Sequence, residues 1–111
     1  MTGITVKGID IHIGSQITQL APYLDALDKM FSLIDQLSNQ GIILEHFDIG
    51  GGMGVRYEQE PDFPIDALSD ALQQKMADRK LEIILEPGRY IVANAGILLT
   101  QVLYTKHNES R

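Results

Sequence analysis

Short apolar runs alternate with amphipathic stretches along this chain, and this order limits the possible folds more than any other feature of the sequence. Residues 6–13, 42–49 and 81–86 are rich in branched apolar side chains and have the length of buried strands. Between them, over residues 20–37 and 65–79, apolar residues recur every three or four positions, which predicts two amphipathic helices. Strands that alternate with helices indicate βα units and therefore an α/β fold with a parallel sheet.

The length of the chain decides between the two architectures that accept this order, a doubly wound sheet and a (β/α)8 barrel. A closed barrel takes roughly 250 residues, whereas this chain has 111. A free three-stranded parallel sheet would leave unpaired edges and an uncovered face in water. We therefore expect the last βα units of an incomplete barrel, with the other barrel strands missing upstream. After a short helical turn at residues 90–95, residues 96–106 are predicted to form one more strand.

Composition excludes several classes of partner. The net charge of −6 leaves no basic stripe for nucleic acid or for an anionic membrane. The longest largely apolar stretch, residues 90–99, falls short of the ~20 residues that cross a bilayer, and the N-terminus lacks the apolar region of a signal peptide. Cysteine is absent, so neither a disulfide nor a thiolate metal site is expected. These features predict a soluble, intracellular protein, and no metal ligands are assigned in it.

Chemically suggestive residues follow each of the three predicted strands. His12 and Ser15 come after the first strand, residues 50–52 are three glycines after the second, and Glu86 and Arg89 come after the third. In parallel α/β folds, ligands bind at the carboxyl ends of strands, because the following loops converge there. The sequence therefore predicts one ligand site that is shared by these three segments.

The stretch DIGGGMG at residues 48–54 predicts an anion site within that region. Backbone N–H groups at a strand-to-loop turn can point together at an anion, and glycine removes the Cβ that would block its approach. A tight turn that requires positive φ is the alternative explanation, but three consecutive glycines favour phosphate binding. The pattern matches neither the P-loop nor the GxGxxG dinucleotide motif.

The other residues of the predicted site each allow a structural and a functional interpretation. His12 is either a hydrogen-bonded structural group or a catalytic one. Glu86 is either a solvated strand terminus or the partner of a protonated ring nitrogen. Arg89 either pairs with Glu86 or uses its rigid guanidinium to bind a phosphate or carboxylate.

Three motifs together, HIGSQ, DIGGGMGVRY and EPGRYIVANAG, resemble the fold-type III pyridoxal-phosphate decarboxylases. The resemblance covers essentially the whole chain in the correct order and spacing. Gln16 and the residues around 52–57 and 90–96 are more similar to the branch that acts on meso-diaminopimelate than to ornithine and arginine decarboxylases. The resemblance implies pyridoxal 5'-phosphate as cofactor, an amino-acid substrate, production of L-lysine and CO2 in lysine biosynthesis, and a cytoplasmic homodimer.

The resemblance also assigns roles to individual residues. Its cofactor-binding positions correspond to His12, Ser15, Gly50, Gly51, Gly52, Glu86, Gly88 and Arg89. His12 would lie against a face of the pyridine ring and Glu86 would pair with the pyridine nitrogen, so both would be catalytic. Ser15, the glycines and Arg89 would surround the phosphate. Arg89 would also be able to hold a substrate carboxylate.

The resemblance implies two domains and one missing group. Residues 1–95 would be the C-terminal part of an alanine-racemase-like, cofactor-binding barrel, and residues 96–111 the start of the following β domain. The lysine that binds the cofactor in this family sits on an early barrel strand, and no lysine here can replace it. We therefore expect residues 1–111 alone to be inactive. An ornithine or arginine decarboxylase and a non-catalytic, barrel-derived binding module remain alternatives.

Overall fold

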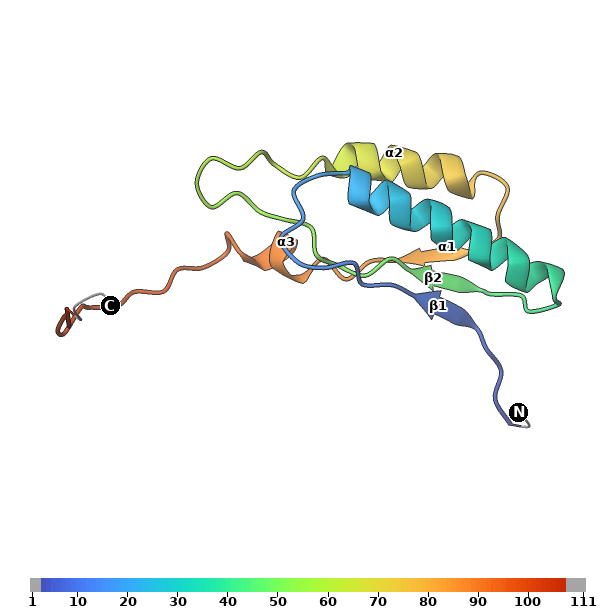
Figure 1. The fold of residues 1–111 in the computed structure, drawn as a ribbon, viewed down its shortest axis with the longest axis horizontal. Helices are drawn as coiled ribbons and strands as arrows, with labels where there is room; N and C mark the ends of the chain where they lie inside the picture. Colours follow the sequence, from blue (N-terminus) through green and yellow to red (C-terminus); the bar gives the residue numbers. More distant parts are fainter. Residues whose placement is uncertain (1–2, 108–111) are drawn as a thin grey trace.

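The structure, a computed structural model, describes residues 3–107. It contains one parallel sheet with strand order β1-β2-β3 and three helices (Figure 1). The elements, in chain order, are β1 (Gly8–Asp10), α1 (Ala21–Asn39), β2 (His46–Asp48), α2 (Ile65–Met76), β3 (Glu82–Ile84) and α3 (Gly88–Val92). The predicted α/β fold with parallel strands and intervening helices is confirmed.

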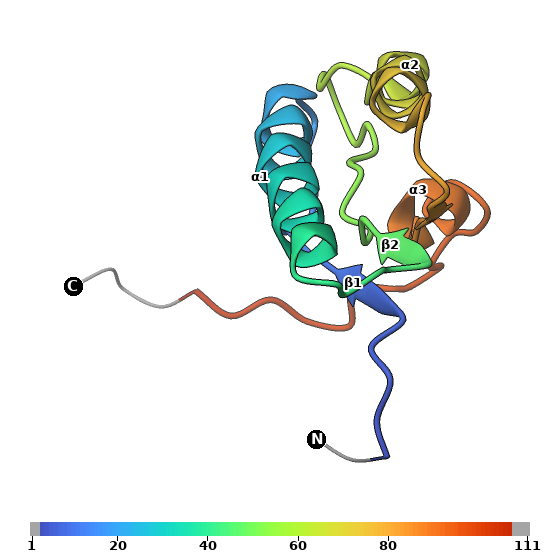
Figure 2. The ribbon, with the colours of Figure 1, turned by 90° about the vertical axis from the view of Figure 1, so that its right-hand side faces the viewer.

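The two long helices lie side by side over one face of the sheet, as Figures 1 and 2 show from two directions. Leu27 on α1, Phe47 on β2 and Leu68 on α2 are fully buried between these two layers. The apolar residues that recur every three or four positions therefore lie on the core-facing side of each helix. No helix or strand among residues 3–107 covers the opposite face of the sheet, so the described sheet is covered on one face only.

The strands and the second helix are shorter than predicted, whereas α1, with 19 residues, has about the predicted length. Each strand has three residues, although single ladder hydrogen bonds continue beyond it, such as Ile11 N–H to Asp48 O at 3.0 Å and Ile49 N–H to Ile84 O at 3.0 Å. Each predicted strand covers a whole apolar run, but only the middle of the run pairs with the neighbouring strands. At both ends of the run the chain bends into a loop. The second helix ends at Met76 rather than at residue 79.

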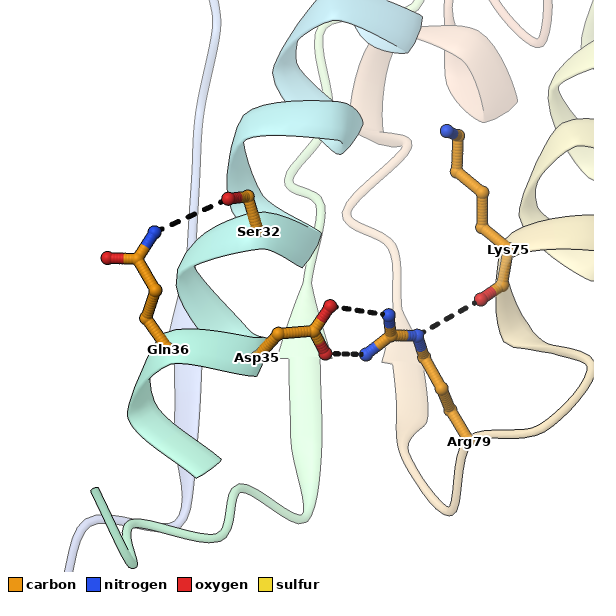
Figure 3. Close-up of polar contacts among 5 residues, drawn as sticks. All are labelled: Ser32, Asp35, Gln36, Lys75 and Arg79. Atoms are coloured by element: carbon orange, nitrogen blue, oxygen red, sulfur yellow. Dashed lines mark hydrogen bonds and ion pairs between the residues drawn. The ribbon is translucent and has the colours of Figure 1, made fainter. Parts of the chain in front are cut away.

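Arg79 follows α2 in the sequence and forms hydrogen bonds with residues of both α1 and α2 (Figure 3). Its Nη1 and Nη2 atoms donate to the two carboxylate oxygens of Asp35 on α1, at 2.5 and 2.9 Å. Its Nε atom donates to Lys75 O at 3.2 Å, and the guanidinium lies 4.9 Å from the centroid of the Phe31 ring. This bidentate pair lowers the pKa of Asp35 and raises that of Arg79. It lies at the amino-terminal end of the strands, away from the predicted site.

The prediction of a strand over residues 96–106 is wrong. Within residues 96–107, the described tail forms no strand and extends away from the sheet (Figure 1). Ile97, Leu98 and Leu99 are 94%, 92% and 90% exposed. A strand needs a partner for its backbone N–H and C=O groups, and within the described residues the tail pairs with no strand of the sheet. The short helical turn expected at residues 90–95 is present two residues earlier, as α3. Residues 108–111 of the predicted second domain lie outside the described residues.

Among the described residues, no helix is long and apolar enough to cross a membrane.

Candidate functional site

The carboxyl ends of the three strands bring the predicted site residues to one edge of the sheet. A Cβ atom added to Gly50 would clash with the carbonyl oxygen of Ile11, the residue that follows β1. It would also lie 3.2 Å from His12 Nδ1. A Cβ added to Gly51 would clash with Glu86 O on the opposite side. The glycine turn at residues 50–52 therefore lies between His12 and Glu86, in contact with the backbone next to both.

The same contacts explain why three glycines are needed. Gly50 and Gly52 have φ values of +71° and +93°, a conformation that side chains with a Cβ rarely adopt. The tight-turn explanation therefore holds for these two residues. Gly51 has no such φ, but the backbone of Glu86 occupies the space that its Cβ would need. A Cβ on Gly52 would also clash with the carbonyl oxygen of Gly14.

Each carbonyl of the glycine turn accepts a hydrogen bond from a different neighbouring segment. The pairs are Glu86 N–H with Gly50 O at 2.9 Å, Tyr23 O–H with Gly51 O at 2.7 Å, and Ile17 N–H with Gly52 O at 2.9 Å. The turn is thus attached on three sides, to the exits of β3 and β1 and to the first turn of α1. All of its acceptors are used within the protein.

The N–H groups of the turn are used differently. Gly50 N–H donates to the Asp48 side chain at 2.8 Å, which closes the turn directly after the strand. The N–H groups of Gly51 and Gly52 donate to no other residue in the described part of the chain. Gly51 is buried, so its N–H requires a partner from outside residues 3–107. Unpaired N–H groups at this edge suit an anionic oxygen.

Arg89 on α3 reaches back over the loops that follow β1 and β2. Its Nη2 atom donates to Ser15 Oγ at 3.3 Å, and its Nη1 atom donates to the Tyr57 hydroxyl at 2.5 Å. All three side chains are exposed. Arg89 forms no ion pair with Glu86 among the described residues, so the alternative pairing of these two is wrong. A guanidinium and two hydroxyls thus form a cluster of donors with one positive charge.

Comparison with known proteins identifies the family of this chain. Residues 1–93 match the family described as pyridoxal-dependent decarboxylase, pyridoxal binding domain. The chain belongs to this family. The diaminopimelate decarboxylase of Pseudomonas fluorescens is 50% identical over the whole chain, which spans 27% of that protein. The corresponding enzyme of Aquifex aeolicus is 42% identical, again over the whole chain and 27% of the relative. The chain therefore spans about a quarter of the curated relatives that it matches.

Solved structures of this decarboxylase family share the fold. Diaminopimelate decarboxylase from Helicobacter pylori, complexed with L-lysine, superimposes with a TM-score of 0.83 and 40% identity, covering 95% of this chain and 27% of that one. A lysine/ornithine decarboxylase from Vibrio vulnificus, complexed with cadaverine, superimposes with a TM-score of 0.66 and 32% identity, covering 77% and 24%. The first similarity is closer in both sequence and structure.

Among the glycines of the predicted site, Gly88 has the fewest close neighbours. A Cβ on Gly88 would have no neighbour within 4 Å, so nothing in the described chain requires a glycine there. The structure brings together His12, Ser15, the glycine turn, Glu86 and Arg89, whereas Gly88 only begins α3 beside them. Its contact with the cofactor remains a prediction.

Three residues that shape the site were not assigned a role in it from the sequence. Gln16 has a φ of +54°, and its side-chain amide donates to Val55 O at 2.6 Å and accepts from Val55 N–H at 3.3 Å. Tyr57 binds Arg89, and Tyr23 binds the glycine turn. Gln16 and Tyr57 lie within the motifs HIGSQ and DIGGGMGVRY, and Tyr23 lies four residues before Leu27 on the apolar face of the helix.

Proposed function

We propose that this chain is the cofactor-binding part of a decarboxylase that converts meso-2,6-diaminopimelate to L-lysine and CO2. The observation that carries the proposal is the position of the glycine turn between His12 and Glu86, at the edge where the three strands end. The 50% identity to a diaminopimelate decarboxylase supports this substrate. We further propose that the complete enzyme is a cytoplasmic homodimer, with residues 1–95 in its barrel and residues 96–111 opening a β domain.

The groups at this edge fit pyridoxal 5'-phosphate. The N–H groups of Gly51 and Gly52, the Ser15 hydroxyl and the Arg89 guanidinium are all donors, as a phosphate monoester requires. Glu86 supplies a carboxylate two residues before α3, on the far side of the turn from His12. This separation allows one end of a ligand to meet donors while its ring lies between an imidazole and a carboxylate.

Each residue then has a physical task. Glu86 keeps a proton on the pyridine nitrogen, because a carboxylate at hydrogen-bond distance stabilises the positive charge. His12 packs against a ring face and fixes its orientation. Ser15, Gly51 and Gly52 hold the phosphate, and Arg89 neutralises part of its charge. When bound, the cofactor supplies a conjugated ring that accepts the electron pair left on the α-carbon as CO2 departs.

Arg89 is assigned to the phosphate in this proposal. Arg89 donates hydrogen bonds to Ser15 and Tyr57, which lie on the loops after β1 and β2, and this position favours the phosphate over the substrate carboxylate. The loops that follow β1, β2 and β3 as far as the next helix contain no lysine. Without such a lysine, residues 1–111 alone are expected not to catalyse decarboxylation.

A hybrid protein tests this proposal. Residues 1–111 replace the matching segment of the Pseudomonas fluorescens enzyme, which is 50% identical over 112 residues. The hybrid should bind the cofactor and decarboxylate meso-diaminopimelate, and Glu86→Ala should abolish activity. Glu82→Ala is the matched control, because Glu82 is a carboxylate at the start of β3, whereas Glu86 follows the end of that strand, where the site lies. Equal activities of the two variants would contradict the role of Glu86.

Substrate competition in the same hybrid separates the related decarboxylases. The Vibrio vulnificus lysine/ornithine enzyme is also a structural relative of this chain, so ornithine and arginine are the appropriate competitors. We expect meso-diaminopimelate to be turned over and ornithine and arginine to inhibit weakly. Preferred turnover of ornithine would show that the wider family, but not the substrate, is correctly assigned.

A further inference from the structure

Tyr23 is a buried tyrosine whose hydroxyl is not needed to fill the core. It lies in the first turn of α1 and is 1% exposed. Its ring packs edge-on against Phe63, with centroids 5.3 Å apart and an interplanar angle of 66°. It is the only buried residue with a hydroxyl among residues 3–107. A phenylalanine would make the same ring contacts, so the hydroxyl requires a separate explanation.

That hydroxyl binds the middle of the glycine turn. It donates to Gly51 O at 2.7 Å, from a position 3.4 Å from the place that a Cβ of Gly52 would occupy. Burial raises the pKa of Tyr23, which keeps the phenol protonated and able to donate. The peptide between Gly51 and Gly52 is therefore anchored through its carbonyl oxygen to helix α1.

The orientation of this carbonyl fixes the orientation of a neighbouring N–H. The described chain has no cis peptide bonds, and in a trans peptide the C=O and the following N–H point in opposite directions. Because Gly51 O points toward Tyr23, Gly52 N–H points away from α1. A peptide flanked by two glycines has little intrinsic preference for one orientation. The phenol supplies that preference.

We propose that Tyr23 is a positioning residue for the phosphate-binding turn: its hydroxyl holds the Gly51–Gly52 peptide so that Gly52 N–H faces a bound phosphate monoester. Tyr23 does not touch the ligand and acts only through the peptide. This inference rests on the proposed cofactor site. It adds a residue from the helical layer to a site that otherwise consists of strand-end loops and α3.

The test compares two ligands that differ only in the phosphate. Pyridoxal 5'-phosphate and pyridoxal are titrated into the hybrid protein and into its Tyr23→Phe variant, and both dissociation constants are measured by equilibrium dialysis. We expect Tyr23→Phe to weaken binding of the phosphorylated ligand roughly 3- to 10-fold, the range of one neutral hydrogen bond. Binding of pyridoxal should not change, because it presents no phosphate to Gly52 N–H.

A core variant controls for loss of packing. Phe63→Leu removes the ring that packs on Tyr23 but leaves the hydroxyl in place. It should lower the thermal midpoint while preserving the ratio of the two affinities. If Tyr23→Phe weakens both ligands equally, or neither, the hydroxyl has only a structural role and the inference is wrong. If the unsubstituted hybrid does not prefer the phosphorylated ligand, the proposed cofactor site itself is wrong.

A second measurement needs no substitution. In the hybrid with isotopically labelled glycine, inorganic phosphate should shift the amide resonance of Gly52. The resonance of Gly50 should stay in place, because its N–H already donates to Asp48 at 2.8 Å. An unmoved Gly52 resonance at saturating phosphate would overturn the inference, even if Tyr23→Phe failed to fold.

Discussion

Four glycine-to-alanine substitutions separate the two reasons for glycine in this chain. Gly88 has an ordinary φ and open space around its Cβ position, whereas Gly41 has a φ of +81° and open space. Gly51 has an ordinary φ, but a Cβ there would clash with Glu86 O. Gly52 combines a φ of +93° with a clash against Gly14 O. The set therefore tests backbone strain and close approach one at a time and together.

The structure gives an order of magnitude for each substitution. Positive φ costs a residue with a Cβ about 1–2 kcal/mol, so this is the expected loss of unfolding free energy for Gly41→Ala. Inserting a methyl group into a packed region costs about 1–3 kcal/mol, which applies to Gly51→Ala. Gly52→Ala incurs both and should lose about 2–5 kcal/mol. Gly88→Ala should stabilise by up to about 1 kcal/mol through the unfolded state.

Urea unfolding of the hybrid protein, followed by circular dichroism, measures these differences. The midpoints should fall in the order Gly88→Ala, Gly41→Ala and Gly52→Ala, with Gly51→Ala well below Gly88→Ala. The decisive comparison is between Gly51 and Gly88, which share an ordinary φ. If Gly51→Ala is as stable as Gly88→Ala, the backbone of Glu86 does not require a glycine there. Ligand approach alone would then explain the residue.

Three further substitutions, one of them with a matched control, test individual contacts in the fold. Arg79→Ala should lower stability more at neutral pH than in acid. The pKa of Asp35 is lowered in the folded state, so the contribution of this pair is present above the ordinary aspartate pKa and is lost as the pH falls through the folded value. The contacts of Arg79 with Lys75 O and the Phe31 ring do not depend on pH in this way, and urea midpoints at both pH values measure the difference. Gln16→Ala should lose about 1–2 kcal/mol with its two bonds to Val55, and an unchanged urea midpoint would contradict it. Leu27→Ala at a fully buried position should lose about 2–5 kcal/mol, whereas Leu33→Ala on the exposed side of the same helix should change the midpoint little.

Local pattern predicted the elements well where one physical cause dominates. The apolar spacing of α1 corresponds to its buried side chains because a single helix face meets the sheet. The prediction of a strand over residues 96–106 failed because strand formation depends on a partner strand. Local composition does not show whether such a partner is present. Likewise, α2 ends at Met76 and leaves Arg79 free to bind Asp35, a contact between positions 44 residues apart in the sequence.

The site shows a different limit of sequence reasoning. The order of the motifs placed His12, the glycines and Glu86 at one edge, because parallel strands share a carboxyl end. Sequence alone could not decide whether the glycines serve a turn or an anion. In the structure these are two consequences of one arrangement. The missing Cβ atoms let the exits of β1 and β3 approach from both sides.

That approach also creates the donors. Neighbouring segments supply hydrogen-bond donors to every carbonyl of the glycine turn, through Glu86 N–H, Tyr23 O–H and Ile17 N–H. In each trans peptide the opposing N–H must then point away from the segment that holds the carbonyl. Two of these N–H groups, on Gly51 and Gly52, have no acceptor within the described residues. The preference for an anion therefore follows from how the protein uses its own acceptors, and it should persist in any variant that preserves these three bonds.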